Sequence, residues 1–173
     1  YFSGIKGHNS IEFDGKNPMP KLSRFIWGNW FKSSISSLTE EDQKLSVSSE
    51  YKFFNGFHKR TLLFDSYLNE WRIIDQFSNF KQVAKVSWRL YPIDWYLEGN
   101  NLKSEIGFIN FNSNNQEISI SLKRGWESKY YGSKSSIPLV EIIFSEWPSK
   151  LVTTINLYSV SYTHLTLPTM AIV

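Results

Sequence analysis

The chain has 173 residues, a formal net charge of +3 and no cysteine. This length is that of about one domain, and the lack of cysteine excludes both a disulfide framework and thiol chemistry. Lysine and arginine are scattered among aspartate and glutamate, which argues against nucleic-acid binding, because phosphate recognition needs basic residues gathered on one face. The small positive net charge is compatible with binding to an acidic polysaccharide. No run of apolar residues approaches the roughly 18 of a membrane-spanning helix.

Aromatic residues make up 17% of the chain, with 7 Trp, 9 Tyr and 13 Phe. This density favours strands and also sugar-binding surfaces, where rings stack on the faces of sugars. We expect most of these rings to lie in the core.

Short runs with alternating polarity predict strands along most of the chain. Ile11 and Phe13 alternate in a first strand that ends at Asp14-Gly15, a strong turn signal because both residues tolerate a positive φ. Residues 37–43 place Ser and Thr ahead of acidic residues and predict one helical turn in a loop. Further strands are predicted over residues 24–31, 45–53, 59–64, 71–77, 82–91, 94–97, 105–111, 117–122, 139–144 and 151–157.

Two of these strands, 59–64 and 71–77, form a hairpin around the turn at 65–70. Connectors rich in Asn or Ser at 110–116 and 133–136 separate later strands. Strands at this spacing, joined by hairpin turns, predict one all-β unit built as an antiparallel sandwich or barrel. The sequence has no internal repeat and no linker that would divide two domains.

Outside residues 160–173, the histidines are His8 and His58, which are candidates for metal binding or substrate contact. His8 lies just ahead of the first predicted strand, where a fixed imidazole suits a metal ligand or a substrate contact. A tetrahedral zinc site needs several ligands, and the sequence has no His-x-His, His-Glu-x-x-His or Cys pair. On residue type alone, His8 is more often a structural histidine.

His58 and Arg60 alternate onto one face of a predicted strand. An arginine there can bind a sugar carboxylate through two hydrogen bonds, which makes both residues candidate substrate contacts. The alternative is that they anchor a sheet edge through hydrogen bonds. Asp75 interrupts an apolar run in the returning strand, and Arg60 is its expected partner across the hairpin.

A third candidate group consists of Trp126, Tyr130 and Tyr131, in a segment flanked by Gly125 and Gly132. These rings either stack on a glycan as substrate-binding residues or close the bottom of the core. Loops often carry binding residues, so both roles stay open.

The two ends of the chain predict a piece of a longer protein. Residues 160–165 are what the bases GTC-TCT-TAT-ACA-CAT-CT encode, which resembles a transposase adapter used to prepare sequencing libraries. We therefore expect a folded domain over 1–159 and an artefactual tail over 160–173; the alternative is a natural strand that ends at Leu167-Pro168. The chain begins at Tyr1 without Met or a signal-like segment.

Several motifs, in order, resemble the heparinase II/III-like family of polysaccharide lyases. The segment Gly7–Ser10 followed by Asp14-Gly15 is similar to the family's "HNT…DG" signature, with Ser10 where Thr is usual and Pro18 where many relatives carry Gln. The resemblance extends to about Ser159, and its other matching segments are Tyr1-Phe2, Arg24–Gly28, His58–Arg60, Trp71–Asp75 and Tyr131-Gly132.

The resemblance implies an all-β, antiparallel β-sandwich of the type that follows an α/α toroid in this family. It implies an activity, the cleavage of uronic-acid-containing polysaccharides by β-elimination, whose catalytic residues lie upstream, so none is expected in this chain. His8 matches a histidine that helps to bind a structural zinc ion together with a His and an Asp located earlier, and His58 and Arg60 match an architectural His-x-Arg.

The partners implied are an acidic polysaccharide and the N-terminal toroid of the same protein, and the implied location is periplasmic or extracellular. The alternative function is a non-catalytic carbohydrate-binding or structural sandwich linked to exopolysaccharide metabolism.

Overall fold

The computed structural model describes residues 2–28, 30, 33–53, 56–113, 118–147 and 149–158, with the side chains of 35–37 excepted. Its elements within these residues are the short 3-10 helix η1 (Ile5–Gly7) and the strands β1 (Ile11–Phe13), β2 (Ser33–Glu41), β3 (Lys44–Phe53), β4 (Gly56–Asp65), β5 (Glu70–Ser78), β6 (Ala84–Arg89), β7 (Tyr96–Glu98), β8 (Asn101–Ser104), β9 (Gly107–Ser113), β10 (Ser119–Glu127), β11 (Ser135–Phe144) and β12 (Ser149–Leu157).

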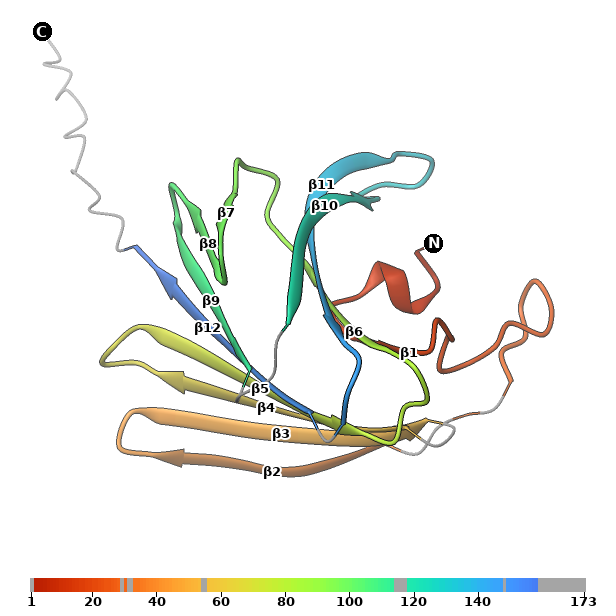
Figure 1. The fold of residues 1–173 in the computed structure, drawn as a ribbon, viewed down its shortest axis with the longest axis horizontal. Helices are drawn as coiled ribbons and strands as arrows, with labels where there is room; N and C mark the ends of the chain where they lie inside the picture. Colours follow the sequence, from red (N-terminus) through yellow and green to blue (C-terminus); the bar gives the residue numbers. More distant parts are fainter. Residues whose placement is uncertain are drawn as a thin grey trace, which may run out of the picture.

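The strands form two sheets that face each other (Figure 1). The larger sheet has the order β2-β3-β4-β5-β12-β9-β8-β7, and the smaller has the order β1-β6-β11-β10. Every pairing between neighbouring strands is antiparallel. The predicted all-β antiparallel sandwich is therefore confirmed. Within the described residues, no helix is long and apolar enough to span a membrane.

The core lies between the sheets and is rich in phenylalanine, because alternate residues of each strand point inward. Phe13 stacks on Phe53 and Phe80, with ring centroids 6.4 and 6.1 Å apart. Phe77 meets Phe144 edge-on at 4.8 Å. Each such buried side chain contributes about 1.5–3 kcal/mol to folding, so these rings hold the two sheets together.

The Asp14-Gly15 turn forms as predicted. Both residues have a positive φ, 53° and 70°, and the Lys16 N–H donates to the Phe13 carbonyl at 3.0 Å, which is the geometry of a tight turn of the primed type. The Asp14 carboxylate then accepts hydrogen bonds from the backbone N–H groups of Lys81, Gln82 and Val83. The end of β1 is thereby tied to the chain that leads into β6.

The helical turn predicted over 37–43 is wrong, because this stretch belongs to the β2–β3 hairpin. Leu38 pairs with Val47 and Glu41 with Lys44, and the turn residues Asp42 and Gln43 take positive φ values of 44° and 65°. Pairing with β3 satisfies the backbone of this segment along its length, which a single helical turn would not do.

The strand predicted over 24–31 is also wrong for the residues described there. Residues 22–28 form an irregular loop closed by hydrogen bonds from Leu22 N to Ile26 O and from Gly28 N to Pro20 O. Phe25 and Ile26 are 84% and 59% exposed, so these two apolar residues face solvent and not a partner strand.

The remaining predicted strands are confirmed with shifted ends, and two strands, β2 and β8, were not predicted. Residues 110–113 of the first expected connector belong to β9, and 135–136 of the second belong to β11. The expected tail, 160–173, lies outside the described residues.

We expect Gly56→Ala to destabilise the domain, because a Cβ at this buried position would lie 2.6 Å from the Phe13 ring. The ring is held between Phe53 and Phe80 and has little room to move. The expected loss is about 1–3 kcal/mol in the free energy of unfolding, measured by urea denaturation. In a Phe13→Ala background the same change should cost much less; an equal cost in both backgrounds would contradict the packing explanation.

Candidate functional site

A buried ionic network lies on the inner face of the large sheet, at the β4–β5 pair. Asp75 on β5 is fully buried, and its carboxylate accepts hydrogen bonds from Arg60 Nε at 2.6 Å and Arg60 Nη2 at 3.0 Å. His58 Nε2 lies 2.7 Å from Asp75 Oδ1. Arg60 and Asp75 are directly opposite in the strand register, so the predicted cross-hairpin pair is confirmed.

The network keeps Asp75 ionised. Burial by itself raises the pKa of this carboxyl, but the hydrogen bond from His58 and the charge of Arg60 outweigh burial and hold the pKa below its usual value. An ionised carboxylate can only accept hydrogen bonds. His58 Nε2 is therefore the donor of the hydrogen bond to Asp75 Oδ1.

Arg60 extends the network from the large sheet to the N-terminal segment and the small sheet. Its Nη1 donates to the carbonyl of Asn9 at 2.6 Å, and its guanidinium lies 4.9 Å from the ring centre of Trp88 on β6. The Asn9 side chain in turn accepts the Arg89 N–H at 2.8 Å. The backbone beside His8 is thus held from both sheets.

Tyr51 on β3 completes the surroundings of His58, with its ring edge-on to the imidazole at 5.1 Å. Burial raises the pKa of the Tyr51 phenol, opposed by a hydrogen bond with Ser10. Tyr51 and Phe53 lie two residues apart on β3 and so share a face. The contact of Tyr51 with His58 follows from the β3–β4 register, in which Tyr51 and His58 are partners.

His8 lies outside this network, immediately after η1, and its side chain is exposed. Its backbone N–H donates to Ile5 O at 3.1 Å. In the described part of the chain, no group of three or more His, Cys, Asp or Glu could hold a metal ion. These residues alone do not provide a zinc site, and a ligand role for His8 stays a prediction that requires partners from elsewhere.

The aromatic group of Trp126, Tyr130 and Tyr131 belongs to β10 and the β10–β11 turn. Tyr130 and Tyr131 are 76% and 108% exposed, so these two rings do not close the core. Trp126 is half-buried, and Lys134 Nζ lies 3.8 Å from its ring centre. A role in substrate binding stays a prediction for all three.

The residues that sequence reasoning proposed therefore fall into separate places. His58 and Arg60 meet at Asp75, on a strand inside the large sheet and not at its edge. Sequence reasoning missed Asn9 and Trp88 as partners of Arg60; no local pattern could have indicated them, because Arg60 and Asn9 are 51 residues apart in the chain.

The fold and the network define an antiparallel β-sandwich whose N-terminal segment is fixed by a buried Arg–Asp pair. No protein-family model matches the sequence, and a search of curated proteins finds no match.

Among solved structures, the chain is similar to the heparinase III BT4657 gene product, with a TM-score of 0.72 and 14% identity, covering 90% of this chain and 24% of that one. It is also similar to the heparan sulfate lyase HepC from Pedobacter heparinus, with a TM-score of 0.72 and 15% identity, covering 92% of this chain and 25% of that one. The resemblance to heparinase-like proteins is confirmed at the level of the fold. The chain spans about a quarter of the length of these structures.

We expect Asp75→Asn to lower the free energy of unfolding at neutral pH by about 3 kcal/mol, because it leaves the half-buried guanidinium of Arg60 without its counter-charge. The pKa of Asp75 is lower in the folded state, so its stabilising effect is present above the unfolded aspartate value of about 3.9 and is lost as pH falls through the folded value. Urea denaturation across pH should show the gap between wild type and variant narrowing below about pH 4. A gap that stays constant to acid pH would contradict an ionised Asp75.

Proposed function

We propose that this chain is a β-sandwich domain of a polysaccharide lyase that cleaves uronic-acid-containing polysaccharides by β-elimination. The observation that supports this most is the similarity of nearly the whole chain, 90–92% of its length, to structures named as heparinase III and heparan sulfate lyase. A fold alone does not determine an activity, so the activity has to be argued from the residues that could carry out the reaction.

β-Elimination needs a base that removes the proton beside the sugar carboxylate, and polar groups that neutralise that carboxylate while negative charge develops. The electron pair then forms a double bond in the sugar ring as the glycosidic oxygen leaves. His58 is 3% exposed and donates to Asp75, and Arg60 donates to Asp75 and Asn9. We therefore propose a structural role for His58 and Arg60 and not a role in substrate binding, because their hydrogen-bond donors already bind Asp75 and Asn9.

The acid–base residues therefore belong to another part of the protein, which we propose is an N-terminal α/α toroid. In this arrangement the sandwich holds the His8 segment rigidly and presents an exposed imidazole beside it. With a His and an Asp from upstream, His8 would complete a structural zinc site. A polysaccharide substrate outside the cell implies a periplasmic or extracellular location.

The exposed rings of Tyr130 and Tyr131 favour a second candidate function. Open tyrosine faces can stack on sugars, so a non-catalytic carbohydrate-binding sandwich linked to exopolysaccharide metabolism would use the same fold without the chemistry.

The lyase proposal predicts that the 173-residue chain is inactive and that a longer protein encoded by the source gene is active. Reading the gene upstream of Tyr1 should find the toroid, a catalytic Tyr, and the His and Asp that join His8. The longer protein, incubated with alginate or heparan sulfate, should produce unsaturated sugars, detected by the ultraviolet absorbance of their double bond. Eliminative cleavage by the 173-residue chain alone would refute the division of roles, and an upstream region without these residues would favour the non-catalytic function.

The zinc proposal makes a separate prediction. The 173-residue chain should bind zinc weakly in calorimetry, because one imidazole cannot close a site. The longer protein should contain stoichiometric zinc by elemental analysis, and His8→Ala should remove it while Lys6→Ala, a control in the same exposed segment, should not. Tight zinc binding by the 173-residue chain would show that the ligands lie elsewhere.

A further inference from the structure

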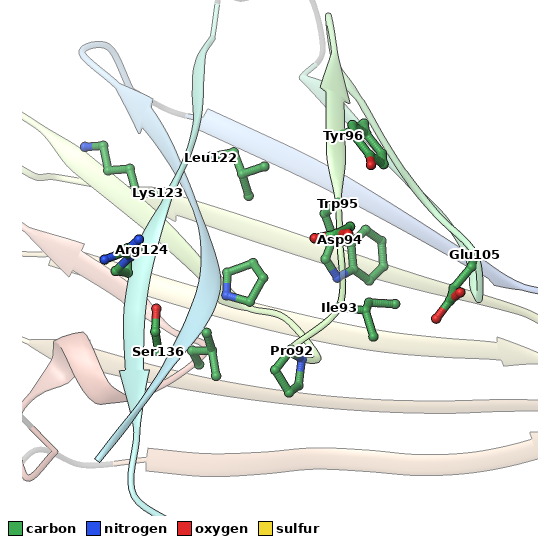
Figure 2. A pocket seen from close by; sticks show the side chains of 12 residues that line it. Pro92, Ile93, Asp94, Trp95, Tyr96, Glu105, Leu122, Lys123, Arg124 and Ser136 are labelled. Carbon is green, nitrogen blue, oxygen red and sulfur yellow. The ribbon is translucent and has the colours of Figure 1, made fainter.

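A groove of about 830 Å³ opens between the two sheets, away from the buried network. One wall is β10 with β11, and the other is the β6–β7 loop with β7 (Figure 2). β10 and β7 are the edge strands of the small and the large sheet, so the groove lies where the sandwich is open. Its size is that of a small-ligand site.

The loop wall of the groove is built into the fold. Trp95 is 9% exposed and forms part of the core, and its indole N–H donates to Tyr91 O at 3.1 Å. The loop is tied to the opposite wall by the hydrogen bond from Leu90 N to Pro138 O, 3.0 Å long. The groove therefore exists before any ligand arrives, and little ordering is needed on binding.

The floor and the rim differ in polarity. Leu122 and Ile93 are half-buried and Ile137 is buried among the lining residues, which gives an apolar floor. The rim carries an exposed tyrosine ring, Tyr96, 64% exposed. Figure 2 shows Tyr96 and Asp94 on the β7 side, across the groove from β10.

The charged side chains of the groove are open to a ligand, with one exception. Lys123 pairs with Glu141 at 2.5 Å and is not available. Arg124 alternates onto the same face of β10 as Leu122. Within the part of the chain that the structure describes, the side chains of Arg124, Asp94 and Glu105 form no hydrogen bond or ion pair, and all three are exposed.

We propose that this groove binds a stretch of an acidic polysaccharide as an accessory site, with a sugar ring on Tyr96 and a uronate carboxylate at Arg124. A sugar has apolar ring faces and hydroxyl edges, which match an open aromatic face beside carboxylates that accept hydroxyl hydrogens. Arg124 supplies the planar donor pair that a carboxylate needs. The choice of an acidic sugar rests on the proposed function.

The charges of the groove also set the substrate class more narrowly. Two carboxylates, Asp94 and Glu105, line the groove together with the guanidinium of Arg124, and both lie on the side opposite β10 (Figure 2). These carboxylates would repel a densely sulfated chain more strongly than a chain with one carboxylate per sugar, because repulsion between like charges in a confined site grows with the charge of the ligand. We therefore expect the groove to bind an unsulfated polyuronate more tightly than heparan sulfate.

The test is a calorimetric titration of the 173-residue chain with alginate oligosaccharides, which are unsulfated polyuronates. Tyr96→Ala and Arg124→Ala should each weaken binding by roughly tenfold or more, since both side chains are exposed and their loss should not disturb the fold. Matched controls are Tyr67→Ala and Arg72→Ala, at exposed positions of the β4–β5 hairpin, which should leave binding unchanged. Highly sulfated heparan oligosaccharides should bind more weakly than alginate.

Several outcomes would overturn the proposal: no binding by the wild-type chain, no loss in the two groove variants, or an equal loss in the controls. Equal binding of neutral cello-oligosaccharides would overturn the acidic selection. The proposed lyase function is tested separately, and it fails if the longer protein does not cleave the polysaccharide. Groove binding without cleavage would support this site and refute the lyase function. Cleavage by the longer protein, with no effect of the groove variants on binding, would support the lyase function and refute this site.

Discussion

A fully buried carboxylate stays ionised only where other groups replace the water it has lost, and Asp75 imposes this requirement on the centre of the sandwich. Its partners His58 and Arg60 lie two residues apart, so both reach the inner face from one strand. The pairing of Arg60 with Asp75 then fixes the register of β4 against β5. A slip by one residue would turn both partners to the outer face and leave the carboxylate bare. Hydrophobic packing alone would penalise such a slip less strongly.

The pairing of Arg60 with Asp75 also fixes the segment Gly7–Gly15 near the start of the chain. Arg60 binds the carbonyl of Asn9, and the Asn9 side chain binds the backbone of Arg89. At the other end of the segment, Asp14 accepts backbone hydrogen bonds from Lys81 to Val83. These hydrogen bonds fix the two ends of β1 to residues of both sheets and of the β5–β6 connection. Among the described residues, the His8 side chain takes no part in these hydrogen bonds and is exposed.

Local patterns predicted the features that depend on neighbours in sequence. Alternation identified most strands, the Asp14-Gly15 pair identified its turn, and the hairpin between β4 and β5 brought Arg60 to Asp75. The errors arose where the residues of a segment fit two local structures equally well. Residues 37–43 carry polar residues that fit a helix start as well as an edge strand, and only pairing with β3 distinguishes the two. The groove was invisible in sequence because its walls come from different sheets.

Burial and partners, and not residue type, separate the two arginines that face inward from these sheets. Arg60 is held by a buried carboxylate and a carbonyl, so an anionic ligand there would have to displace bonds that the fold needs. Arg124 has the same guanidinium at the open edge of the small sheet, with solvent in place of a partner acid. An incoming carboxylate at Arg124 replaces water alone, at little cost to the sandwich. For this reason the interior network is suited to fixing the chain, and the proposed contact with an acidic glycan falls to the groove and not to this network.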